Sequence, residues 1–236
     1  MLAAAGCGNS TLDLLNPDLG LLAHWAFDEP TAGDAAVDSG GFGLGALPSQ
    51  NPPTPMRDVP PVRFRDPYSL SFNGQDQWMT VGNPPLLNAG GLISIAAWVR
   101  LGSASGFRNV VAHGFRTNPN QELVLRANSG NYEFNYWNNT DHIAVVAVPE
   151  GDIGTWTHLC AVFDGATYAL YRNGALAAST PDTTAPPPNM ETPWTIGGRT
   201  PQTDGGEQRP FQGEIDDVRL YGRALTASEV AALYQR

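Results

Sequence analysis

The closing segment of the chain, residues 213–234, places the strongest constraint on its fold. Its first half, EIDDVRLY, combines β-branched, aliphatic and aromatic residues with interleaved charges, which is typical of a strand. After a Gly-Arg break, Thr226 and Glu229 have the spacing of a capping box, in which each side chain binds the backbone amide of the other residue. The apolar residues around this box form a helical stripe: Leu225, Val230, Leu233 and Tyr234. The segment therefore predicts a strand that runs into a short capped helix.

Short apolar segments alternate with turn residues through the rest of the chain. Its 236 residues include 26 glycines and 20 prolines, which suit many short strands joined by turns. The sequence predicts strands at residues 21–27, 69–72, 78–81, 93–100, 109–114, 123–127, 132–137, 142–147, 157–164, 168–172, 194–196 and 213–221. Asn173-Gly174 and the break at 163–167 predict hairpins. The Pro-rich stretches 48–67 and 181–193 are expected to be surface loops.

Six segments, LLAHWAFDE, DSGGFGLGAL, SLSFNGQDQWMTV, LISIAAWVR, WTHLCAVFDGATYALYRNG and WTIGGR, precede the closing strand and helix. In this order they resemble the laminin-G-like, concanavalin-A-like jelly rolls of bacterial surface and secreted proteins. The resemblance implies an all-β fold over residues 20–236, an antiparallel two-sheet β-sandwich with a short C-terminal helix. Because jelly rolls host lectins, enzymes and adhesion modules, the resemblance implies the fold more strongly than the function.

Charge and cysteine content narrow the range of partners. The formal net charge of -10, with no basic stripe, argues against nucleic acid and anionic membranes. No apolar run reaches the roughly 18 residues of a membrane span. Cys160, between apolar neighbours in THLCAVF, is expected to be a buried thiol, and neither it nor Cys7 has a metal-type partner at short spacing.

Small residues precede Cys7 in MLAAAGCGNS, and this start resembles the end of a bacterial lipoprotein signal. In such proteins the cysteine is lipidated and becomes the mature N-terminus, so residues 1–19 are expected to be a signal remnant and tether. Ala4 stands where such a signal usually has Leu, and a short disordered N-terminus is the alternative. The resemblance implies a bacterial envelope or extracellular location, with membrane attachment only through Cys7.

Two carboxylates stand where similar jelly rolls hold a structural calcium ion. The resemblance implies Asp216 of the final strand and Asp28 of the first strand as ligands, with Asn73 and Gly74 supplying carbonyl or amide oxygens. Calcium takes about six to eight oxygens, so two carboxylates with carbonyls and water would suffice. The alternative is that these carboxylates are solvated, pair with a nearby arginine or cap a turn.

The strand at 132–137 divides its side chains between two faces: Tyr132, Phe134 and Tyr136 on one, Glu133, Asn135 and Trp137 on the other. If the tyrosines and Phe134 enter the core, Trp137 and Asn135 face outward beside Asn139 and His142. An exposed indole next to amide groups suits a sugar, which offers an apolar C–H face and hydroxyls together. The alternative is that Trp137 packs on a neighbouring strand or loop.

A glycoside hydrolase is a third interpretation. Glu214-Ile215-Asp216 resembles the start of the acid/base strand in laminarinase-type enzymes, which share the sandwich. Retaining hydrolysis needs a second carboxylate about 5 Å away, and Val218 and Arg219 stand where that second Glu would fall. Two carboxylates facing each other across one sheet would favour this interpretation.

These features predict a non-enzymatic recognition or adhesion module outside the cytoplasm, which binds a glycan or a cell-surface protein, with carbohydrate as the preferred ligand. The alternative is a structural or protein-interaction module that calcium holds rigid and that has no sugar site. An exposed Trp137 in a groove favours the first, and a buried Trp137 beside a flat apolar patch favours the second.

Overall fold

The computed structural model describes residues 16, 18–88, 90–117, 120–186, 192–200 and 208–236. Eight strands of this described part form the larger sheet: β1 (Leu21–Trp25), β3 (Thr54–Met56), β4 (Ser69–Asn73), β6 (Ile93–Leu101), β11 (Trp156–Phe163), β12 (Thr167–Arg172), β13 (Ala175–Pro181) and β15 (Gln212–Tyr221). They run in the order β13-β12-β11-β6-β15-β4-β3, and β1 also pairs with β15. All of these pairings are antiparallel.

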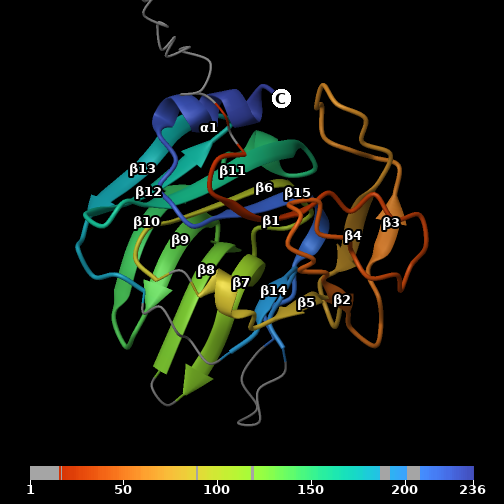
Figure 1. Ribbon diagram of the computed structural model, residues 1–236, viewed down its shortest axis with the longest axis horizontal. Helices are drawn as coiled ribbons and strands as arrows, with labels where there is room; N and C mark the ends of the chain where they lie inside the picture. The colour runs from red at the N-terminus through yellow and green to blue at the C-terminus, as the bar shows by residue number, and fades with distance from the viewer. Residues whose placement is uncertain (1–15, 17, 89, 118–119, 187–191, 201–207) are drawn as a thin grey trace, which may run out of the picture.

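The second sheet has seven strands in the described part of the chain: β2 (Leu47–Pro48), β5 (Met79–Gly82), β7 (Phe107–Thr117), β8 (Asn120–Asn128), β9 (Asn131–Trp137), β10 (Asp141–Ala147) and β14 (Trp194–Ile196). They run in the order β10-β9-β8-β7-β14-β5-β2, again antiparallel. The 3-10 turns η2 (Pro85–Leu87) and η3 (Glu150–Asp152) lie in the connections. The two sheets lie face to face as a sandwich (Figure 1), which confirms the predicted all-β, two-sheet fold.

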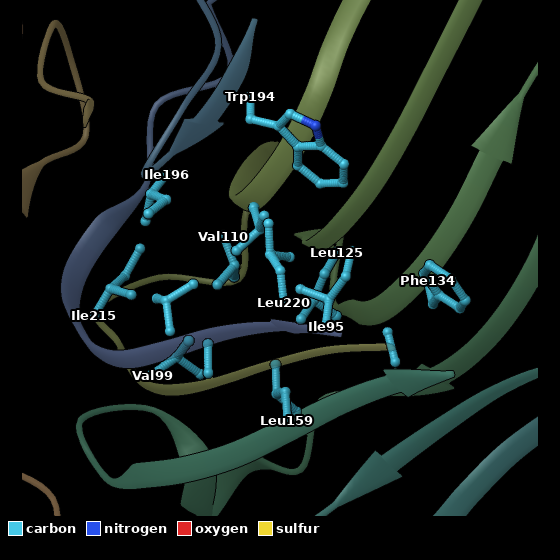
Figure 2. Close-up of a cluster of buried hydrophobic side chains, with 14 of the residues drawn as sticks. Ile95, Val99, Val110, Leu125, Phe134, Leu159, Trp194, Ile196, Ile215 and Leu220 are labelled. Carbon is cyan, nitrogen blue, oxygen red and sulfur yellow. The ribbon is translucent and has the colours of Figure 1, made fainter. Parts of the chain in front are cut away.

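The main core lies between the sheets. In Figure 2, Ile95, Val99, Leu159, Ile215 and Leu220 of the larger sheet face Val110, Leu125, Phe134, Trp194 and Ile196 of the seven-stranded sheet. These side chains are almost completely buried, and along regular parts of the strands core residues alternate with residues of the outer face. Side chains at the alternate positions of the seven-stranded sheet are therefore directed away from the core.

The helix α1 (Ala227–Tyr234) follows β15 and lies over the larger sheet (Figure 1). Its capping box is present as predicted, because Thr226 Oγ1 accepts a hydrogen bond from the Glu229 amide and Glu229 accepts one from the Thr226 amide. The apolar stripe packs into a second buried cluster on the outer side of this sheet: Ala96, Cys160, Val162, Ala169, Tyr221, Leu225, Val230 and Leu233. Cys160 is a buried free thiol, as expected.

The Asn173-Gly174 hairpin agrees with its prediction, but one Pro-rich stretch does not. Asn173 and Gly174 both have positive φ, 50° and 78°, and close the β12–β13 hairpin as predicted. The expectation that 48–67 is only a surface loop is wrong, because β3 lies inside it and pairs with β4 at the end of the larger sheet. Pro55 is tolerated there because an edge strand leaves one row of amides unpaired, so a missing N–H costs little.

Removing the cap of α1 should lower stability measurably. In the variant Thr226→Ala we expect a loss of about 1 kcal/mol, because the Glu229 amide loses its acceptor at the helix end. For a chain of this size that loss corresponds to a fall in Tm of about 2–4 °C, measurable by calorimetry. Ser228→Ala, at an exposed position of the same helix, is the matched control, and an equal fall in both variants would contradict the capping role.

Candidate functional site

A polar pocket lies on the outer face of the seven-stranded sheet. Tyr132, Phe134 and Tyr136 of β9 enter the core, as the alternation predicts. The intervening Asn135 and Trp137 therefore line the outer face, and Trp137 is partly exposed. The pocket has a volume of about 280 Å³, and its described lining comprises Phe107, Glu122, Arg126, Asn128, Glu133, Asn135, Trp137, Asp141, Ile143 and Arg209.

The floor of this pocket is a network of ion pairs. Glu122 Oε2 lies 2.6 Å from Arg209 Nη1 and 3.8 Å from Arg126 Nη1. Arg126 Nε in turn donates to Glu133 Oε2 at 2.6 Å. Arg199 Nη1 lies 3.6 Å from the other oxygen of Glu122. Each floor carboxylate is thus paired with at least one guanidinium, which is what the burial of charge requires.

Phe107 holds two of the three floor arginines in place. The guanidinium carbons of Arg209 and Arg126 lie 4.2 Å and 4.9 Å from the centre of its ring. Such cation–π contacts stabilise a desolvated cation and restrict its rotamers. The result is a pre-organised polar floor beside the Trp137 indole.

Two of the predicted ligand-binding residues lie outside this pocket. His142 pairs in register with Tyr136, stacks on its ring at 5.7 Å, and its Nδ1 lies 2.7 Å from Asp182 Oδ2. The expectation that His142 shares a face with Trp137 is therefore wrong, because the alternation of β10 directs Asp141 and not His142 to that face.

Asn139 is likewise not part of the lining. It is exposed in the turn between β9 and β10, with a φ of 75°. By contrast, Asn135 does belong to the site, and its Nδ2 donates to Asp141 Oδ1 at 2.5 Å. Asp141 pairs in register with Trp137 and lies at the exposed rim.

The two floor carboxylates, Glu122 and Glu133, are better placed to bind a ligand than to act as a general acid. Glu122 and Glu133 share one face of the sheet, but arginines contact both of them. Both glutamates accept hydrogen bonds from these arginines, whereas glycoside hydrolysis needs a carboxyl group that donates a proton to the leaving oxygen. Glu214, at the start of the laminarinase-like motif, lies on the larger sheet within 3.7 Å of Arg100.

A second cluster of carboxylates lies beside β15. Asp216 is completely buried, and Asp66, from the Pro-rich stretch 48–67, approaches it. Three buried carboxylate oxygens, both of Asp66 and Oδ2 of Asp216, accept no hydrogen bond from an amide, hydroxyl or guanidinium group in the described part of the chain, and the two carboxyl groups contact each other. Burial raises the pKa of Asp66 to about 7, with repulsion from Asp28 and Asp217 as further causes. Burial first, and then Asp66 and Asp217, raise the pKa of Asp216 as well.

The other predicted calcium ligands are distributed unevenly around this cluster. Asp28 is exposed but near enough to raise the pKa of Asp66. Asn73 pairs with Gln212 at the start of β15, and its side chain bonds to Asp76. The structure therefore does not bring Asn73 or Gly74 to Asp216, because the antiparallel register places Asn73 at the start of that strand while Asp216 lies in its middle.

The donor set of this cluster still fits a hard cation. Unpartnered, desolvated carboxylate oxygens are the ligands that calcium prefers, and a bound cation would remove the repulsion between them. Among the described residues no group of three or more His, Cys, Asp or Glu side chains converges on one point. The pair Asp66 and Asp216 would therefore need carbonyls and water to complete the coordination.

The neighbouring carboxylate, Asp217, is already paired. It has a φ of 49° at the β-bulge of β15, which turns it toward Arg219 and His24. His24 Nε2 lies 2.5 Å from Asp217 Oδ1. Although burial opposes ionisation, Arg219 and His24 hold the pKa of Asp217 below its ordinary value. Asp217 is thus a structural ion-pair partner.

A larger cavity of about 870 Å³ lies beside β1. Its walls include the apolar side chains Leu19, Leu21, Leu22, Phe42 and Phe64. Its lining contains no tryptophan and is mainly apolar, so it suits sugars less well than the pocket at Trp137.

In the part of the chain that the structure describes, no helix has the length and apolar character to span a membrane. The predicted lipidation site, Cys7, lies outside the described residues.

The two-sheet sandwich with a polar pocket on one outer face defines a lectin-type β-sandwich domain. The chain belongs to the concanavalin A-like lectin/glucanase superfamily, whose profile matches residues 73–231. No curated protein sequence matches the chain.

Solved structures with the same fold include sugar-bound domains. Domain 4 of AbnA, an extracellular GH43 arabinanase from Geobacillus stearothermophilus, was solved in complex with arabinotriose; it matches with a TM-score of 0.71 and 21% identity, over 91% of this chain and 98% of that one. The binding domain of Paraclostridial Mosquitocidal Protein 1 gives a TM-score of 0.70 at 15% identity, over 93% of this chain. The binding domain of Botulinum neurotoxin DC in complex with SialylT gives a TM-score of 0.64 at 12% identity, over 93% of this chain. This chain covers about half, 52%, of the mosquitocidal and of the neurotoxin binding domain. At such identities the likeness concerns the fold.

Proposed function

We propose that this protein is a non-enzymatic recognition module that binds carbohydrate in the pocket on the outer face of the seven-stranded sheet. The observation that carries this proposal is the partly exposed indole of Trp137 beside the polar groups of Asn135, Asp141 and Glu133. A sugar ring stacks its C–H face on an indole while carboxylate and amide groups bind its hydroxyls.

The geometry also favours binding over hydrolysis. Glu122 and Glu133 both accept hydrogen bonds from arginines of the floor. The likeness to the arabinotriose-bound domain of an arabinanase and to toxin binding domains supports a glycan partner.

A glycan array provides the test of this proposal. We expect the folded domain to bind a small set of oligosaccharides above background, without releasing reducing ends over a day of incubation. Sugar release from a bound oligosaccharide would show an enzyme, and binding to no glycan by a protein with a cooperative melting transition would contradict the carbohydrate function.

We also propose a stabilising calcium ion held by Asp66 and Asp216, with Asp28 close by. The three unpartnered buried oxygens favour this second role. The cluster lies on the larger sheet and the sugar pocket lies on the other sheet, so a bound calcium would not contact the sugar. Its role would be to neutralise the charge of the buried carboxylates.

We further propose a location on the bacterial envelope or outside the cell, with Cys7 as a lipid anchor. This rests on the resemblance of the first residues to a lipoprotein signal. Intact-mass analysis of the protein from membranes should find a diacylglycerol-modified cysteine at its start, and an unmodified N-terminus would contradict the anchor.

A further inference from the structure

We infer, given the proposed carbohydrate-binding function, that the pocket at Trp137 selects uncharged sugars and discriminates against sialylated and uronic-acid glycans. The basis is the charge balance of the pocket, its floor and rim taken together. In the described part of the site, three carboxylates face three guanidinium groups: Glu122, Glu133 and Asp141 against Arg126, Arg199 and Arg209.

The arginines of the floor are already engaged. Arg209 binds Glu122 at 2.6 Å, and Arg126 binds Glu133 at 2.6 Å while lying 3.8 Å from Glu122. The ring of Phe107 covers one face of both of these guanidinium groups. A sugar carboxylate could therefore gain an arginine only by displacing a glutamate that is itself buried, and an unpaired buried charge is costly.

The carboxylates of the floor retain acceptor capacity. An ionised carboxylate has about four lone-pair sites, and Glu133 uses two close contacts, with Arg126 Nε at 2.6 Å and Asn128 Nδ2 at 3.0 Å. The remaining sites are suited to the hydroxyl donors of a neutral sugar. At the rim, the exposed carboxylate of Asp141 lies in register with Trp137 and repels an anionic ligand that approaches the indole.

Matched glycan pairs test this selectivity. The probes are arabinotriose, lactose against 3′-sialyllactose, and galactotriose against trigalacturonic acid, extended by neutral and oxidised pairs for whichever glycan the array identifies. We expect each neutral member to bind at least about tenfold more tightly than its anionic counterpart. Its affinity should change by less than about twofold between 50 and 500 mM NaCl, because screening weakens only net charge interactions.

The isosteric variant Glu133→Gln should change the selectivity. It removes the close partner of Arg126 and makes the net charge of the pocket more positive by one unit, so the preference for the neutral member should fall to about threefold or less. Asp141→Asn, at the exposed rim, changes the net charge equally without altering the buried floor, and should reduce the preference about twofold. Glu150→Gln, at an exposed position outside the pocket, is the control.

The outcomes separate two failures. Binding of both members of a pair with equal affinity in the unaltered protein, or a preference that neither Glu133→Gln nor Asp141→Asn reduces, overturns the selectivity while the carbohydrate function stands. Binding to no glycan at all overturns the carbohydrate function and the selectivity with it. Because Asp141 is exposed, its variant is expected to fold even if Glu133→Gln does not.

Discussion

Trp137→Ala should weaken binding of the array-selected glycan by about 30-fold or more. The indole is the large aromatic surface at the open side of the pocket, and removal of a central tryptophan from a binding surface costs about 2 kcal/mol or more. About 1.4 kcal/mol corresponds to a tenfold change in Kd, so the loss should be evident by isothermal titration calorimetry. Trp137→Phe, which keeps an aromatic face, should retain part of the affinity.

Trp156→Ala is the matched control for this prediction. Trp156 is also a partly exposed tryptophan, but it lies on β11 of the larger sheet and its Nε1 donates to Asp58. We expect its loss to change stability slightly and glycan affinity by less than twofold. If both tryptophan variants bound the glycan as tightly as the unaltered protein, the pocket would not be the binding site.

Calcium should raise the thermal stability of the domain substantially. At a calcium concentration about 100 times Kd, mass action predicts about 2.7 kcal/mol, or roughly 5–10 °C in Tm for a chain of this size. The comparison is a calorimetric scan in chelator against one in millimolar calcium. Equal melting temperatures, together with no metal by elemental analysis, would contradict a cation at Asp66 and Asp216.

The pH dependence of the free energy of unfolding, measured in chelator, tests the same cluster independently. Because the folded pKa of Asp66 is raised to about 7, the folded state binds more protons than the unfolded state between about pH 4 and pH 7. Stability is therefore greatest at the acidic end of this window and falls as the pH rises through it. After allowance for solvent screening around partly exposed Asp66, we expect a loss of roughly 1–2 kcal/mol.

Amide substitutions should have opposite effects in the two conditions. Asp66→Asn removes the repulsion from Asp216, so in chelator at pH 8 it should be at least as stable as the unaltered protein. In calcium, however, it should lose the stabilisation. Asn73→Ala is a control, because Asn73 pairs with Gln212 and is not brought to Asp216. A calcium response lost in Asn73→Ala but kept in Asp66→Asn would contradict this assignment.

The sequence could predict which residues of β9 line the sugar pocket, but not the whole network of ion pairs in its floor. The alternation of β9 determines which side of the sheet Asn135 and Trp137 occupy, since one face must enter the core. The same reasoning applied to ELVLRAN would have found Glu122 and Arg126 on that face. Arg209 could not be found this way, because it reaches Glu122 from a segment far along the chain.

For the cation cluster, the sequence could predict Asp216 but neither Asp66 nor the place of Asn73. Asp216 was identified from its place in the closing strand, but the register of β15 against β4 places Asn73 beside Gln212. Asp66 has no local signal, because a Pro-rich stretch has no periodicity from which to infer the direction of a side chain. The hairpin register pairs His142 with Tyr136, so the alternation of β9 continues unchanged into β10 and directs His142 away from the face of Trp137.

A two-dimensional NMR titration with the array-selected glycan tests the central claim most directly. We expect the largest shifts at the Trp137 indole N–H and the Asn135 side-chain amide, with smaller shifts at residues of β8 and β10. Shifts concentrated at the cavity beside β1, around Leu21 and Phe42, with the Trp137 indole unmoved, would contradict it.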